Sequence, residues 1–121
     1  ESHQDAATAP VRLYYTGWSS STGEADWGLR PLFAGDKTPP SMYNISYYKN
    51  PTVDADIMKA LGTTDRAEKT KLYTEVQEEI WKDAPWAFLV TEKLLYATSK
   101  KLTGMYVMPD ANYFFEEIDL Q

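Results

Sequence analysis

Apolar residues in the middle of the chain recur at the spacing of an amphipathic helix. On one face of residues 51–62 lie Val53, Ile57, Ala60 and Leu61. This spacing indicates a helix that packs on one side. Asn50 is a typical N-cap, Pro51 suits the first helical position and Gly62 suits a helix end. We therefore predict a helix from Pro51 to Gly62.

A second, longer helix is predicted directly after the first. Asp65 and Glu68 have the spacing of a capping box, in which each side chain bonds the backbone N–H of the other residue. One apolar face then runs through Leu72, Tyr73, Val76, Ile80 and Ala84. Pro85 cannot continue a helix, so we expect this one to end near residue 84.

The rest of the chain favours short strands and one short helix. Runs rich in β-branched and aromatic residues predict strands at 11–16, 86–90, 94–98 and 102–108, with a turn at Gly104, and a last extended segment at 113–120. Asp26 could cap a helix that reaches about Phe33, in which Pro31 is an awkward member. The loop 17–23 and the segment 35–43 are predicted to be irregular. Together these elements predict a mixed fold, α/β or α+β, with few strands and several helices.

Composition narrows the range of partners. The chain has 121 residues, a net charge of −6 and no cysteine. A negative chain is repelled by nucleic acid and by anionic membrane surfaces, so neither is an expected partner. No apolar run approaches the 18 residues that a membrane span needs. Disulfides and thiolate metal sites are excluded because there is no cysteine.

Candidate catalytic and metal-binding residues are few. The single histidine, His3, lies in a polar, irregular start, and Glu116, Glu117 and Asp119 lack the spacing of a calcium loop. We therefore expect no metal, no cofactor and no nucleophilic catalysis. Glu24 and Asp26 leave open a glycosidase-like enzyme, although acidic residues also favour the positive end of a helix.

The loop after the first predicted strand is the candidate binding site. Trp18 offers a flat apolar face, and the hydroxyls of Ser19, Ser20, Ser21 and Thr22 follow it. Ligands of open α/β sheets bind at the carboxyl ends of strands, where such loops lie. These five residues are the predicted contacts to a polar ligand. The high aromatic content, 14% of residues, leaves a carbohydrate-binding module as an alternative.

Several segments resemble one family of binding proteins in the order that this family has. Residues 15–27, 47–54, 65–73 and 83–90 resemble the C-terminal region of the family 5 extracellular solute-binding proteins, which serve ABC importers of peptides, nickel and glutathione. Residues 102–110 and 115–121 resemble the end of the glutathione-binding members. The resemblance covers residues 11 to 121.

The resemblance implies a function without bond chemistry. It implies the C-terminal part of a type II periplasmic-binding-protein-like fold, in which residues 1–92 belong to lobe II and residues 93–121 return toward lobe I. In this family the two lobes close on a solute and present it to the permease in the inner membrane. The implied ligand is glutathione or a related short peptide, the implied location is the periplasm, and no cofactor is implied.

One position departs from the family pattern. Dipeptide-binding and oligopeptide-binding members have an aspartate three residues after the tryptophan, which pairs with the α-amine of the peptide. Here Ser21 stands in its place, which removes a charge-assisted hydrogen bond of about 1.5–3 kcal/mol. Glutathione fits better because its γ-linkage places the charges differently. General dipeptide or oligopeptide binding remains the alternative.

The resemblance also has consequences for the isolated chain. The segment after Lys93 should pair with strands of the other lobe, and unpaired strand edges invite association with another chain. We therefore expect self-association or disordered ends, and weak or no glutathione binding by this chain alone. The arginine that holds the ligand carboxylate in the family matches neither Arg12 nor Arg30.

Overall fold

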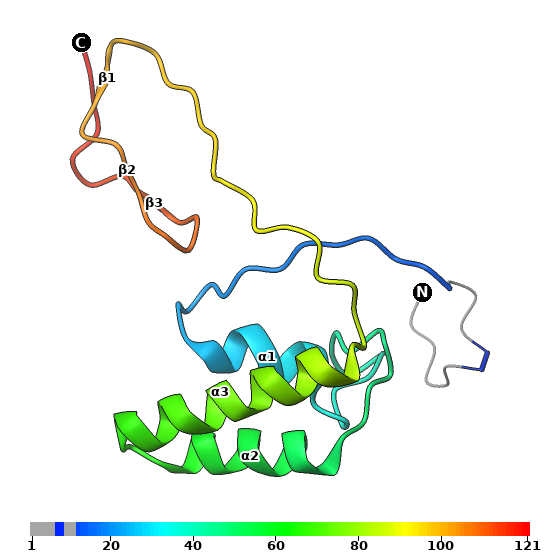
Figure 1. The fold of residues 1–121 in the computed structure, drawn as a ribbon. Helices are drawn as coiled ribbons and strands as arrows, with labels where there is room; N and C mark the ends of the chain where they lie inside the picture. The colour runs from blue at the N-terminus through cyan, green and yellow to red at the C-terminus, as the bar shows by residue number, and fades with distance from the viewer. Residues whose placement is uncertain (1–6, 9–11) are drawn as a thin grey trace.

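The helices form the packed part of the molecule, and the strands form a separate hairpin (Figure 1). The computed structural model describes residues 7–8 and 12–121. Its helices are α1 (Ala25–Phe33), α2 (Pro51–Gly62) and α3 (Arg66–Asp83). Its strands are β1 (Leu102–Thr103), β2 (Tyr106–Val107), β3 (Tyr113–Phe114) and β4 (Asp119–Leu120). The mixed fold class predicted from the sequence is confirmed.

Both predicted helix caps are present. The Asn50 side chain accepts hydrogen bonds from the backbone N–H of Thr52 (2.9 Å) and of Val53 (3.4 Å). Asp65 accepts in the same way from Ala67 (2.8 Å) and Glu68 (3.1 Å). These bonds satisfy N–H groups that have no partner inside the helix.

The return bond of the predicted capping box is relayed by Thr63. The backbone N–H of Asp65 donates to Thr63 Oγ1 (3.2 Å), and the Thr63 hydroxyl donates to Glu68 Oε2 (3.0 Å). The Glu68 carboxylate therefore supports the start of α3 through a hydroxyl instead of bonding the backbone directly.

The core lies between α2 and α3, with α1 packed across them. Its buried residues are Leu32, Phe33, Ala34, Val53, Ile57, Val76 and Ile80, and a second cluster is formed by Ala60, Leu72 and Tyr73. The predicted apolar faces are thus confirmed except at their ends. Leu61 is exposed, and Ala84 is an exposed left-handed cap at φ 48°.

A polar cluster joins the start of α2 to the end of α3. Asp83 Oδ2 accepts from the Tyr48 hydroxyl (2.6 Å) and from Asn50 Nδ2 (2.8 Å). These two hydrogen bonds lower the pKa of the Asp83 carboxyl. Burial, followed by the bond to Asp83, raises the pKa of Tyr48 to about 12. Asn50 therefore caps one helix and ties it to the next.

Replacing Asn50 tests this double role. We expect Asn50→Ala to lower the free energy of unfolding by about 1–2 kcal/mol, because the first turn of α2 loses its cap. Asn50→Ser keeps a capping oxygen and loses only the link to Asp83, so it should cost clearly less. Urea unfolding followed by circular dichroism at 222 nm measures both. Equal losses for the two variants would show that the cap contributes little.

The strands predicted at 11–16, 86–90 and 94–98 are wrong for the described residues. Residues 12–16 and 86–98 are assigned to no strand, and residue 11 lies outside the described part. Leu13 and Leu95 are 92% and 93% exposed. A strand is defined by hydrogen bonds to a neighbouring strand, and these segments have no such neighbour among the described residues.

The predicted strand at 102–108 is two short pieces separated by a turn. Leu102 pairs with Leu120, and Tyr106 pairs with Phe114, in antiparallel register. The last extended segment, 113–120, is thereby confirmed in part. At Gly104, φ is +74° and a Cβ atom would lie 1.8 Å from the Glu117 carbonyl oxygen, so only glycine fits the predicted turn.

In the described chain, the strands contact one another but no helix. An extended segment from Ala84 to Lys101 connects α3 to the hairpin (Figure 1). The expected division at residues 92 and 93 falls within this segment and stays a prediction.

Candidate functional site

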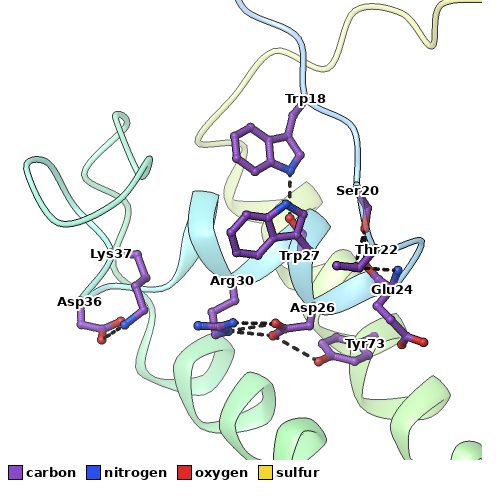
Figure 2. A network of polar contacts seen from close by, with 10 residues as sticks. All are labelled: Trp18, Ser20, Thr22, Glu24, Asp26, Trp27, Arg30, Asp36, Lys37 and Tyr73. Carbon is purple, nitrogen blue, oxygen red and sulfur yellow. Dashed lines mark hydrogen bonds and ion pairs between the residues drawn. The ribbon is translucent and has the colours of Figure 1, made fainter. Parts of the chain in front are cut away.

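Trp18 is held against the side of α1 by its indole nitrogen. The Nε1–H donates to the Trp27 carbonyl oxygen at 2.9 Å (Figure 2). The Trp18 ring lies 6.1 Å from the Trp27 ring and 5.1 Å from the Tyr43 ring, measured between centroids. Trp18 is 38% exposed. Part of the indole is therefore open to solvent, while the hydrogen bond and the two neighbouring rings fix its position.

Pro31 explains why the Trp27 carbonyl is free to accept this bond. In an α-helix, the N–H of residue 31 would bond the carbonyl of residue 27. Proline has no N–H, so the carbonyl four residues before it loses its helical partner. The Trp18 indole supplies the missing donor. The proline that looked awkward in the sequence thus creates the anchor for Trp18.

Two of the predicted hydroxyls build the turn that enters α1. Ser20 Oγ donates to the Glu24 carbonyl at 2.7 Å, and Thr22 Oγ1 accepts from the Glu24 N–H at 3.2 Å. The two hydroxyl oxygens lie 3.3 Å apart. Figure 2 shows both side chains directed at the start of α1. These hydroxyls are therefore mainly occupied by the protein itself.

The other two hydroxyls are open. Ser19 and Ser21 are exposed, and neither side chain has a hydrogen-bond partner among residues 7–8 and 12–121. Their donors and acceptors are available to a ligand beside the Trp18 ring. The predicted set thus divides into a supporting pair, Ser20 and Thr22, and an exposed pair, Ser19 and Ser21.

Of the two neighbouring carboxylates, Asp26 is engaged in an ion pair and Glu24, within the described chain, is not. Glu24, not Asp26 as predicted, occupies the N-cap position of α1, and it makes no side-chain capping bond. Asp26 forms a two-pronged ion pair with Arg30, Nε–Oδ1 and Nη2–Oδ2 both at 2.8 Å (Figure 2). This bond to Asp26 raises the pKa of Arg30. Because the Asp26 carboxylate is already paired with Arg30, a structural role at the start of α1 suits it better than glycosidase chemistry.

Tyr73 of α3 completes this group. Its hydroxyl lies 3.5 Å from Asp26 Oδ1. Burial, together with the charge of Asp26, raises the pKa of Tyr73 to about 12. The phenol therefore stays neutral at physiological pH and ties the start of α1 to the middle of α3.

An open depression lies beside the loop 17–23. It has a volume of about 620 Å³ and is bordered by Gly23, Glu24 and Ala25 on one side and by residues of α3 such as Lys69 and Tyr73 on the other. Trp18 to Thr22 do not line it. The predicted site is thus an exposed edge next to a depression and not an enclosed pocket in this chain.

A second loop, residues 34–50, supports the Trp18 face from the other side. Its centre is Asn44, the one buried polar side chain among the described residues. Asn44 Nδ2 donates to the carbonyls of Ala34 (3.0 Å) and Tyr48 (2.8 Å). Asn44 Oδ1 accepts from the Ser46 hydroxyl (2.9 Å) and the Tyr48 N–H (3.1 Å). A buried amide with all these bonds fixes the path of the loop.

Sequence reasoning missed Tyr43, Asn44 and Trp27 as parts of this region. Tyr43 and Trp18 are 25 positions apart, and no spacing rule joins them. Pro31 was the one available signal, because a proline within a helix leaves a carbonyl that needs another donor.

The described residues contain neither a cluster of metal-binding side chains nor a helix that could span a membrane. Among residues 7–8 and 12–121, no three His, Cys, Asp or Glu side chains gather as a metal site would require. None of the helices in that part of the chain combines the length and apolarity needed to cross a bilayer.

Comparison with known proteins supports the resemblance found in the sequence. The chain is 62% identical, over 110 residues, to the glutathione-binding protein GsiB of Pectobacterium atrosepticum, and this match covers 91% of the chain. It is 54% identical, over 111 residues, to the proteins of that name in Salmonella typhimurium and Escherichia coli K12. No family model matches the chain.

These matches cover only part of each relative. The chain spans 21% of the Pectobacterium protein and 22% of the other two. The resemblance to the glutathione-binding members of the solute-binding family is confirmed, and the short coverage agrees with one C-terminal piece of such a protein.

Proposed function

We propose that the chain is part of the substrate-binding component of an ABC importer. It matches about a fifth of the length of each glutathione-binding protein named above. This component would bind glutathione or a related short peptide in the periplasm and deliver it to the permease in the inner membrane. The structural observation that carries the proposal is the Trp18 ring, which is held by a hydrogen bond to Trp27 and is still 38% exposed to solvent.

The geometry around Trp18 suits binding without bond chemistry. A fixed aromatic face packs against methylene or thiol groups at low entropic cost. The open hydroxyls of Ser19 and Ser21 can pair with amide or carboxylate groups of the solute. Ser21 carries no charge, so this edge has no strong partner for a free α-amine. In a γ-linked peptide the α-amine lies farther from the first amide, beside a free α-carboxylate. This different placement of the charge favours a γ-linked peptide over an ordinary dipeptide at this edge.

A two-lobed arrangement would complete the site. We propose that residues 1–92 contribute this edge to one lobe and that residues 93–121 run toward the other. The opposite wall, with the cation for the ligand carboxylates, would come from the remaining part of the protein. Closure of the two walls would remove the ligand from water, which strengthens each polar contact.

Calorimetry on the whole binding protein tests the ligand class. Glutathione, glutathione disulfide and a plain dipeptide are titrated separately. We expect heat from glutathione or its disulfide and little from the dipeptide. Heat from the dipeptide alone would overturn the assignment to glutathione.

Replacing Trp18 tests the site itself. We expect Trp18→Ala to weaken glutathione binding by roughly thirtyfold, because truncating a central aromatic contact costs about 2 kcal/mol. Trp81→Ala is the matched control, since Trp81 is exposed on α3 and lies outside the site. Dissociation constants from calorimetry should separate the two variants. Equal affinities would remove Trp18 from the binding site.

A further inference from the structure

We propose that Tyr43 is a second ligand-contacting residue and that its hydroxyl determines specificity by bonding a polar group of the peptide. This inference rests on the proposed function, because it places Tyr43 beside the Trp18 edge. Neither the family resemblance nor the loop at 17–23 points to this residue.

Tyr43 extends the exposed aromatic face of the site. Its ring centroid lies 5.1 Å from that of Trp18, and the two planes are tilted by 50°. Tyr43 is 51% exposed, more than Trp18. Tilted rings in contact form a corner, and no ligand can enter between them. A solute that packs on the exposed part of the Trp18 ring would therefore lie beside Tyr43.

The hydroxyl of Tyr43 can form a hydrogen bond with a ligand, which the Trp18 side chain cannot. The single donor of the Trp18 side chain is already bonded to the Trp27 carbonyl. Tyr43 Oη has no hydrogen-bond partner within the described chain. A phenol can both donate and accept, so it can bond an amide or a carboxylate oxygen of a short peptide. Tyr43 thus provides the polar contact at the aromatic corner.

The backbone around Tyr43 is fixed before any ligand arrives. The Tyr43 N–H donates to the Pro31 carbonyl at 3.1 Å, and the Asn44 N–H donates to the Lys37 carbonyl at 2.9 Å. Asn44 is fully buried and bonds the loop at both of its ends. An exposed side chain on such a rigid support loses little entropy on binding, which is how binding sites are preorganised.

Substitution of the hydroxyl alone tests the inference. In the whole binding protein, Tyr43→Phe should weaken glutathione binding about fivefold, the effect of one lost neutral hydrogen bond. Tyr43→Ala, which also removes the ring, should weaken it further. Tyr106→Phe is the matched control, because Tyr106 is exposed on β2, a strand that contacts no helix in the described chain. Calorimetry gives the dissociation constants, and thermal unfolding shows whether each variant is folded.

The outcomes distinguish this inference from the proposed function. If Trp18→Ala weakens binding and folded Tyr43→Phe and Tyr43→Ala bind as the unmodified protein does, the inference is overturned and the proposed function stands. If the unmodified protein binds neither glutathione nor its disulfide, both fail. A loss in Tyr43→Phe that is absent in Tyr106→Phe supports the role of the hydroxyl.

Discussion

An Asn44→Ala variant should lose about 3–5 kcal/mol of unfolding free energy, because a buried hydrogen-bonding hub disappears. The Asn44 side chain is 0% exposed and serves backbone groups of Ala34 and Tyr48. Alanine would leave these buried or half-buried groups without partners and would also leave a small void. Each unsatisfied buried group costs about 1–3 kcal/mol.

Urea unfolding monitored at 222 nm measures this loss. Ser46→Ala is the matched control, since Ser46 gives only one bond to Asn44 Oδ1 and is half-buried. We expect the control to lose no more than about 1 kcal/mol. If both variants unfold at the same urea concentration, the side chain of Asn44 does not hold the loop together. Since that loop carries Tyr43, folded Asn44→Ala should also bind ligand less tightly.

The 121-residue chain by itself should bind glutathione at least roughly a hundredfold more weakly than the whole binding protein, since small-molecule sites normally bury about 70–90% of their ligand. In this chain Trp18 and the two open serines form one exposed edge, and the neighbouring depression is open to solvent. An edge without an opposite wall leaves most of the solute in water. Side-by-side calorimetry of the two proteins measures the difference.

An affinity of the isolated chain close to that of the whole protein would contradict this expectation and would show that one wall suffices. Light scattering on the same sample controls for assembly. Exposed extended segments such as 12–16 and 86–98 favour self-association, and a second copy could supply part of the missing surface. Self-association of the isolated chain stays a prediction.

The helices could be predicted from the sequence because their signals are local. The boundaries of α2 follow from Asn50, Pro51 and Gly62, which act within one turn of the chain. The boundaries of α3 follow in the same way from Asp65 and Pro85. Apolar residues at helical spacing then identified the faces that form the core.

The strands could not be predicted in the same way, because a strand depends on a partner. The run 12–16 has strand-forming residues, yet hydrophobic pattern alone does not supply a neighbour to bond. The hairpin at residues 102–120 forms because its partners lie within the same short stretch of chain. Rules that use only neighbouring residues in the sequence cannot show which distant segments pair as strands.

The role of the five site residues stays a prediction, and the sequence shows little of how they are arranged. Trp18 is 38% exposed and bonds the carbonyl that Pro31 leaves without a helical partner, a contact between residues nine positions apart. The four hydroxyl residues look alike in the sequence. In the structure, Ser20 and Thr22 bond the backbone at the start of α1, and Ser19 and Ser21 stay open. Tyr43 comes to the same place only through the turn that Asn44 fixes.

The proline within α1 has a consequence for attempts to make this protein more heat-resistant. Judged by helix propensity, Pro31 is the obvious residue to replace, since proline costs about 3 kcal/mol in a helix interior. A better helix former there would offer its own N–H to the Trp27 carbonyl and would compete with the indole that bonds there now. The helix would become more stable, but the Trp18 ring would lose its hydrogen bond and become less ordered. Gains in stability often reduce activity in this way.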